Sequence, residues 1–216
     1  LFGHYFTPIG TSANNFKGIF DGNNHTIYGL TIENQYNTYC DNSVGLFAYA
    51  NNAELTDVNM ALVHITSNKQ YAGALVGLAT SSEISLIDIN LEDAINAGVV
   101  KSFSETSAYI GAIAGSIAGG ILDKSTTHLN IDVNNGVGGG VVGINTATID
   151  QVSSSSNVIN NVNGGIVGGI VGDNQGVLTN AFFEGTLVAN KTAQAAGGVV
   201  GNNAGSVKFP YANASK

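Results

Sequence analysis

The apolar positions of the chain recur in a short phrase of the form Gly-small-aliphatic-small-Gly. Full copies occupy residues 73–77, 111–115, 139–143, 168–172 and 197–201, and a looser copy occupies residues 45–48. The last residues of successive copies lie 29, 38, 28, 29 and 29 residues apart. A fixed period in this range indicates stacked repeats, each too small to bury its own apolar face.

Short runs rich in Val, Ile, Leu and Thr lie between the glycine phrases, and Gly, Asn, Asp and Ser separate them. None of these runs sustains the apolar period of a helix, so each repeat is expected to hold two or three strands joined by turns. We therefore predict an all-β fold, a parallel β-helix (solenoid) of about seven coils with a repeat of about 29 residues. The whole chain, residues 1–216, is expected to form a single β-helix domain.

Stacked coils would place equivalent side chains directly over one another. One predicted ladder is aliphatic and consists of Leu75, Ile113, Val141, Ile170 and Val199. A second is polar and consists of Asn145, Asn174 and Asn203. Stacked amides can hydrogen-bond from coil to coil, which satisfies polar groups at a bend, so we interpret the asparagines as structural.

The positions that follow the aliphatic ladder are apolar as well. They are Phe47, Val76, Ala114, Val142, Val171 and Val200. Successive side chains of a straight strand point to opposite faces, so this second ladder would form an exposed stripe suited to lateral packing. Alternatively, a bend at the glycines turns both ladders inward. The sequence leaves both alternatives open.

The 38-residue interval exceeds the period by nine residues, which we place in an insertion at about residues 95–108. Insertions in repeat arrays map to loops on one face, which is often the binding face, although long loops are also tolerated as drift. The polar, aromatic segment 35–42 is a second candidate protrusion. The candidate partner-binding residues of these two loops are Tyr36, Tyr39, Lys101, Phe103 and Glu105.

Composition excludes some classes of partner. The 216 residues carry a net charge of −8 and no arginine, so the chain lacks the basic surface that binding to nucleic acid requires. The longest weakly polar stretch, residues 109–122, is shorter than the roughly 20 apolar residues of a membrane span. We therefore expect no nucleic-acid partner and no membrane span in this chain.

The sequence holds few residues in catalytic, cofactor-binding or metal-binding patterns. Residues 138–143 fit the dinucleotide pattern G-x-G-x-x-G, but they are one copy of the repeat and open no helix that could hold a pyrophosphate, so no cofactor is predicted. The histidines occupy different repeat offsets, so they predict no metal site. They are His4, His25, His64 and His128.

The aspartates are scattered along the chain and form no Asp-Asp pair. They include Asp57, Asp88, Asp93, Asp123, Asp132, Asp150 and Asp173. General acid and base catalysis uses clustered carboxylates, so we expect the chain not to be an enzyme.

The segment from Phe16 to Leu30, followed by the glycine phrases, resembles the GLUG-repeat family. That family occurs in large bacterial surface proteins, including filamentous-haemagglutinin-like adhesins and the non-catalytic regions of some immunoglobulin A proteases. The resemblance extends from Phe6 to Val207 and departs from the pattern at Ala48 and in the 38-residue interval. It implies a right-handed parallel β-helix on a bacterial surface and carries over no catalytic residues. We expect the chain to be a fragment of a larger surface protein.

The expected function is that of a non-catalytic, extracellular β-helical adhesin or stalk module. Its loops would be presented to a protein or glycan on a host or neighbouring surface. One alternative is an ice-binding β-helix, which needs ranked Thr or Asn side chains. Against it, the threonines share no single repeat offset, as seen for Thr26, Thr56, Thr126, Thr148, Thr179 and Thr186. A second alternative is a polysaccharide-active β-helix enzyme, which needs paired carboxylates in a groove.

Overall fold

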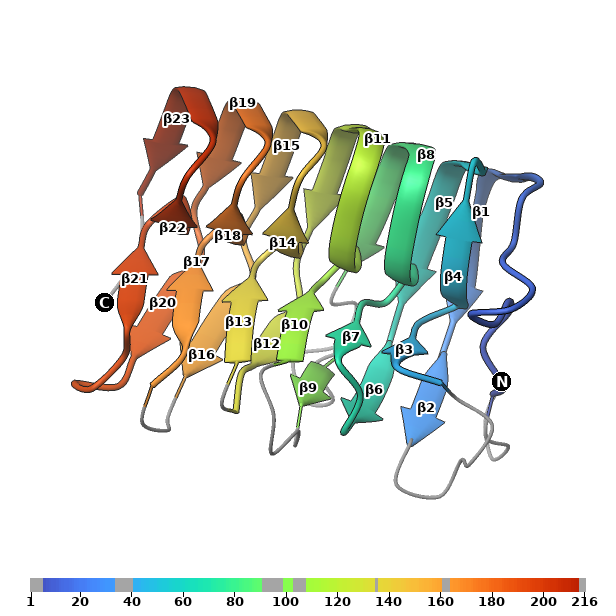
Figure 1. Cartoon of the computed structure of the whole chain (residues 1–216), viewed down its shortest axis with the longest axis horizontal. Helices are drawn as coiled ribbons and strands as arrows, with labels where there is room; N and C mark the ends of the chain where they lie inside the picture. The colour runs from blue at the N-terminus through green and yellow to red at the C-terminus, as the bar shows by residue number, and fades with distance from the viewer. Residues whose placement is uncertain are drawn as a thin grey trace.

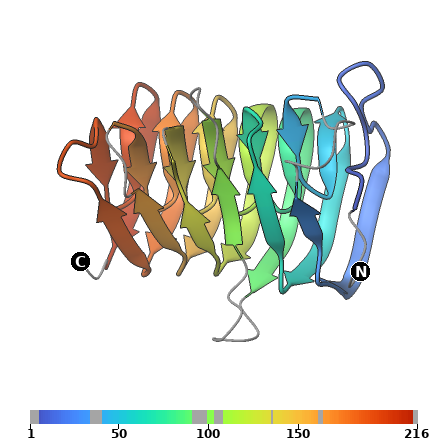
Figure 2. The same cartoon turned by 90° about the horizontal axis from the view of Figure 1, so that it is seen from below.

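The structure is a computed structural model that describes residues 6–33, 41–90, 99–102, 108–134, 136–160 and 164–213. Within these ranges the chain forms 23 β-strands, which wind around one axis as a solenoid (Figures 1 and 2). Every pairing between strands is parallel, and the pairs join successive coils. The predicted all-β, parallel solenoid is therefore confirmed.

The strands belong to three sheets, which we call the long, second and third sheets. The long sheet has 11 strands, namely β1 (Ile19–Tyr28), β4 (Phe47–Asn51), β5 (Glu54–Ala61), β8 (Val76–Asn90), β11 (Ala114–Thr127), β14 (Val142–Asn145), β15 (Thr148–Ser154), β18 (Val171–Asn174), β19 (Val177–Phe183), β22 (Val200–Asn203) and β23 (Ser206–Ala212). The second sheet has six strands, namely β2 (Thr31–Glu33), β6 (His64–Ser67), β9 (Val99–Ser102), β12 (Asn130–Asp132), β16 (Asn157–Asn160) and β20 (Thr186–Ala189). The third sheet has six strands, namely β3 (Ser43–Val44), β7 (Tyr71–Ala72), β10 (Ala108–Gly111), β13 (Gly136–Gly139), β17 (Ile166–Gly168) and β21 (Ala195–Gly197).

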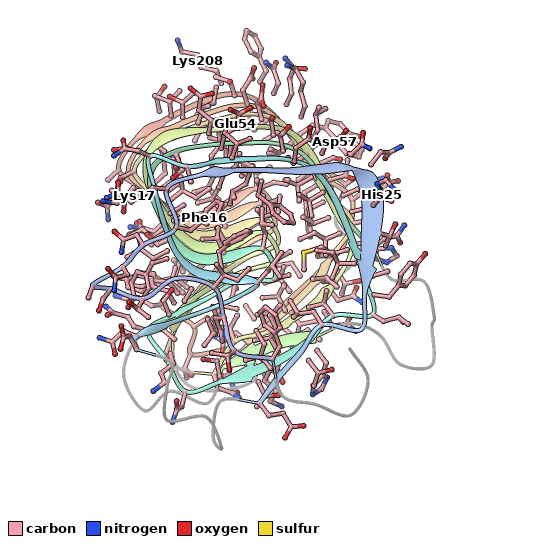
Figure 3. All side chains as sticks on the ribbon, turned by 90° about the vertical axis from the view of Figure 1, so that its right-hand side faces the viewer. Phe16, Lys17, His25, Glu54, Asp57 and Lys208 are labelled. Atoms are coloured by element: carbon pink, nitrogen blue, oxygen red, sulfur yellow. The ribbon has the colours of Figure 1, made fainter. Side chains whose placement is uncertain are left out.

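Each coil runs through the long, second and third sheets in that order and then returns to the long sheet one layer further along (Figure 1). Each of the two shorter sheets has six strands, which corresponds to about six turns of the solenoid. The predicted number of seven coils corresponds to the layers of the long sheet, which begins and ends the stack. Seen from the N-terminal end, the chain passes clockwise from Lys17 to His25 and the later coils recede behind it (Figure 3). The solenoid is therefore right-handed.

The aliphatic ladder forms one column of the core. Leu75, Ile113, Val141 and Ile170 are each 0% exposed. The backbone links them in series, because each N–H in this column donates to the carbonyl of its counterpart on the next coil, at 2.9 to 3.2 Å. Val199 continues the column in the last described layer, where it is only partly buried.

The apolar stripe lies inside the solenoid. Phe47, Val76, Val142 and Val171 are all 0% exposed, so the alternative of a solvent-facing contact stripe is wrong. The reason is a bend between the third and long sheets, which falls on the two residues before each of these side chains. Because the chain turns there, consecutive residues of the two ladders both point into the core. Lateral packing through this stripe is excluded for the described coils.

Glycine is needed at the bend because backbones approach closely there. A Cβ at Gly111 would lie 2.5 Å from the carbonyl oxygen of Val141 on the next coil. A Cβ at Gly143 would lie 2.5 Å from the amide nitrogen of Ile110 and 2.6 Å from the carbonyl oxygen of Gly115. Neither Gly111 nor Gly143 has a positive φ. The absent side chain, not the backbone conformation, is what the bend requires.

The asparagines stack inside the solenoid just past the bend. Asn145 Nδ2 donates to Asn174 Oδ1 at 2.8 Å, and Asn174 Nδ2 donates to Asn203 Oδ1 at 2.7 Å. Asn145 Oδ1 also accepts the backbone N–H of Ala147 at 2.9 Å. Asn145 and Asn174 are 0% exposed, so these bonds satisfy amides that would otherwise be buried without partners.

Part of the predicted insertion is a regular strand. Strand β9 (Val99–Ser102) pairs in register with β6 and with β12, and Val100 is fully buried. The additional residues therefore fall in two places. Val99 lies nine positions after Asn90, whereas their partners in the preceding coil, Ala61 and His64, are three positions apart. The step from β9 to β10 is three residues longer than that from β6 to β7. Both extra segments, 91–98 and 103–107, lie outside the described residues.

A corner in the middle of the long sheet is made by residues other than glycine. In this column φ lies between 47° and 56°, and its members are Asp57, Leu86, Lys124, Gln151, Asn180 and Phe209. The left-handed region suits Asn and Asp, which can hydrogen-bond locally, and strains residues such as leucine. Leu86 is moreover 49% exposed, so it has little packing to offset that strain.

Replacing Leu86 by asparagine is therefore expected to stabilise the protein by about 1 kcal/mol. Urea unfolding followed by circular dichroism would measure the change. Val177→Asn is the matched control, because Val177 is 38% exposed and is not among the positive-φ residues. An equal loss of stability in both variants would contradict the assignment of strain to this corner.

Candidate functional site

The structure describes one of the five candidate loop residues. Lys101 lies in β9, and its Nζ is 2.6 Å from Asp132 Oδ2 on the neighbouring coil. This ion pair partly neutralises the charge of Lys101 on the outer face of the second sheet. Tyr36, Tyr39, Phe103 and Glu105 lie outside the described residues, so their predicted role stays a prediction.

The C-terminal end of the 35–42 loop, residues 41 and 42, is anchored. Asp41 Oδ2 accepts hydrogen bonds from the backbone N–H and the hydroxyl of Ser12, at 3.0 and 2.7 Å, and these bonds lower the pKa of Asp41. The N–H of Asn42 donates to the hydroxyl oxygen of Tyr49 at 3.2 Å. These bonds fix where the chain re-enters the solenoid.

Two tyrosines stack on the outer face of the third sheet. The rings of Tyr71 and Tyr109 have centroids 5.6 Å apart at an interplanar angle of 14°. Burial raises the pKa of Tyr71, as expected for a phenol packed among neighbours. The two rings cover each other, and each is half-buried.

Folding brings two acids together that the sequence does not show as a pair. Asp123 and Asp150 are register partners on adjacent coils of the long sheet. Lys124 Nζ lies 3.2 Å from Asp123 Oδ2. Hydrogen bonds from Thr179 and Asn180 lower the pKa of Asp150. A general acid needs a raised pKa, so the shift at Asp150 is opposite to that of a glycosidase proton donor.

The candidate site is an open cleft of about 300 Å³, which we call the corner cleft. It lies on the outside, where β8, β11, β15 and β19 end and the chain turns toward the second sheet. Its polar rim is formed by exposed side chains from the coils of β8, β11 and β19, namely Asp88, Asn90, His128 and Glu184. Phe182 supplies an aromatic wall. Thr126 donates its hydroxyl to Asp88 Oδ1 at 3.0 Å, which holds that carboxylate in place.

Buried hydroxyl groups support the corner cleft from below. Thr127 donates to the carbonyl oxygen of Gly140 at 2.8 Å. Ser156 Oγ lies 3.3 Å from Thr127 Oγ1 and accepts the N–H of Leu129 at 3.0 Å. These groups already have protein partners, so the exposed rim and the aromatic wall are the parts of the site that can contact a ligand.

The aromatic wall belongs to a stacked pair. The rings of Phe182 and Tyr211 are nearly parallel, at 1°, with centroids 5.1 Å apart. They are 39% and 56% exposed. Adjacent exposed aromatic side chains on an otherwise polar outer face usually mark a binding surface.

Compared with known protein families, with curated proteins and with solved structures, the chain matches none of them. Among the described residues, no three His, Cys, Asp or Glu side chains gather in a group that could hold a metal ion. The same ranges contain no helix of the length and apolar character needed to cross a membrane.

Sequence reasoning missed the corner cleft, although the repeat held a signal for it. Asp88, Thr126, Ser153, Phe182 and Tyr211 occupy one register position on five successive coils, which we call the outer column. Their spacings of 38, 27, 29 and 29 residues follow the period of the glycine phrases. Aligning the whole repeat, rather than only its apolar positions, would have placed these residues side by side.

Proposed function

We propose that this chain is a non-catalytic β-helical module, an adhesin or stalk, of an extracellular bacterial surface protein of the GLUG-repeat type. The observation that carries the proposal is the combination of one core running through all coils with an aromatic and polar cleft on the outside. Six layer spacings of about 4.8 Å make a rod roughly 30 Å long. A rigid scaffold of this kind holds surface groups in fixed positions, which lowers the entropy cost of binding.

Displaying the whole chain on bacterial cells that do not otherwise adhere would test this function. We expect saturable adhesion of these cells to immobilised glycans or matrix proteins, and competition by the purified soluble chain. Cells that display the anchor alone are the control. Adhesion equal to that control on every surface would contradict an adhesin role.

No observation favours the two alternative functions. Register forms no rank of threonines on the long sheet. Thr56 and Thr179 share a column, but Ser85, Asp123 and Asp150 lie between them, and Thr148 is in another column, where it pairs with Ile121. Ice binding depends on a flat rank of such side chains, and these columns do not form one. The paired acids of the long sheet have the charge partner and the lowered pKa described above, so they give an enzyme hypothesis no support.

A further inference from the structure

We propose that the corner cleft binds a neutral glycan, with one pyranose ring stacked on the uncovered face of Phe182. This inference rests on the proposed function, since it names the ligand of the same module. It depends on three features of the described residues: an interrupted aromatic column, a rim of mixed hydrogen-bonding groups, and the repeat of that rim along the axis.

The aromatic column is interrupted at the cleft. Tyr211 covers one face of Phe182, and the register partner on the other side is Ser153. Serine is too small to cover a ring, so the second face of Phe182 borders the cleft. A flat ring placed over Ser153 would continue the stack by one step. The face of an aromatic ring is negative and attracts the polarised C–H groups of a pyranose.

The rim matches the hydroxyl groups of a sugar. Asp88 and Glu184 provide acceptors, Asn90 provides a donor and an acceptor, and the His128 ring provides either according to its tautomer. A sugar hydroxyl both donates and accepts, so it can bond to each of these groups. An acidic glycan would bring its carboxylates close to Asp88 and Glu184, in a chain whose net charge is −8. The site therefore selects neutral sugars.

The rim also repeats along the axis. Asn90, His128, Ser155 and Glu184 occupy equivalent positions on four successive coils, two residues after the outer column. Coils stack about 4.8 Å apart, so successive rim groups are spaced on the scale of one sugar unit. We expect the unit stacked on Phe182 to lie across the axis, in the plane that continues the aromatic stack, and the hydroxyl groups of this unit and its neighbours to bond to the rim.

Titration calorimetry of the whole chain with neutral hexasaccharides tests this site. The probes are β-1,4-linked glucose, α-1,4-linked glucose and β-1,4-linked mannose, with oligogalacturonate as the acidic probe. We expect one neutral series to bind and the acidic probe not to bind. Phe182→Ser should weaken binding about ten-fold, the upper range for one aromatic contact. Phe209→Ser is the matched control, because Phe209 is 77% exposed and is not among the residues that line the cleft, and it should bind as the unchanged chain does.

Circular dichroism of each variant separates a lost site from a lost fold. No binding of any neutral probe, or equal affinity in Phe182→Ser and the unchanged chain, would overturn the glycan site. Displayed Phe182→Ser chains separate the two proposals. If these cells still adhere while the purified chain binds no sugar, the adhesin function stands and the glycan site falls. If the unchanged chain shows neither adhesion nor sugar binding, both proposals fall.

Discussion

Replacing Gly143 by valine is expected to destabilise the protein by about 3 kcal/mol or more, because the new side chain has no space. Its Cβ alone would lie 2.5 Å from the nitrogen of Ile110 and 2.6 Å from the oxygen of Gly115. These are backbone atoms on two coils, so relief requires the coils to separate. A typical domain is stable by only 5–15 kcal/mol, so this change removes a large share of the total. Urea unfolding followed by circular dichroism would measure it.

Gly164→Asn is the matched control for this prediction. Gly164 has φ of +76°, a conformation that asparagine tolerates, and an added Cβ there would meet nothing within 4 Å. Its cost should stay below about 1 kcal/mol. Equal losses for the two variants would show that the glycines act through backbone entropy, and would contradict the close packing of coils at the bend.

Replacing Asn174 by leucine is expected to cost about 2 to 3 kcal/mol, because it leaves buried amide groups without partners. Leucine is similar in volume, so the loss reports the hydrogen bonds to Asn145 and Asn203 more than a cavity. Asn203→Leu is the matched control. Asn203 is exposed at the last described coil and should cost less than about 1 kcal/mol.

Coupling within the ladder gives a second readout of the same prediction. Once Asn174 is leucine, Asn145 has lost its partner on the next coil, so adding Asn145→Leu should cost less than it does alone. A double-mutant cycle would measure that non-additivity, which is expected for residues in one hydrogen-bond network. Strictly additive losses would mean that the amides do not support one another.

The sequence predicts the solenoid because every coil repeats the same physical requirements. The aliphatic column of Leu75, Ile113, Val141 and Ile170 and the asparagine column both follow from one period, and stacking converts that period into contact. Such regularity makes the repeat more informative than any single strand.

The errors arose where a local bend overrode a simple rule. Alternation along a straight strand left open a solvent-facing Val142 and Val171, but the close approach of backbones at the glycines turns both inward. The interval around β9 looked like a single insertion, because the extra residues on both sides of Val100 conceal a regular strand.

The corner cleft could not be derived from apolar periodicity. It depends on which outward-facing residues share a column and on the small size of Ser153 beside Phe182. Outward positions vary freely between coils, because the core does not constrain them. Their grouping becomes visible only when the register is known.

Distances between spin labels test the central claim, that equivalent residues stack coil upon coil. Labels on cysteines at Thr56 and Lys208, in a Cys40→Ser chain, lie five layers apart in register and should be separated by roughly 24 Å. Labels at Ser85 and Lys208 should be one layer closer, at roughly 19 Å. The distance between labels at Asp123 and Lys208 should be shorter again by the spacing of one layer, because Asp123 and Ser85 are partners on adjacent coils. This step should equal the previous one, although Asp123 follows Ser85 by 38 positions in the sequence. Equal steps support the solenoid, and steps that scale with sequence separation, or broad distributions, would contradict it.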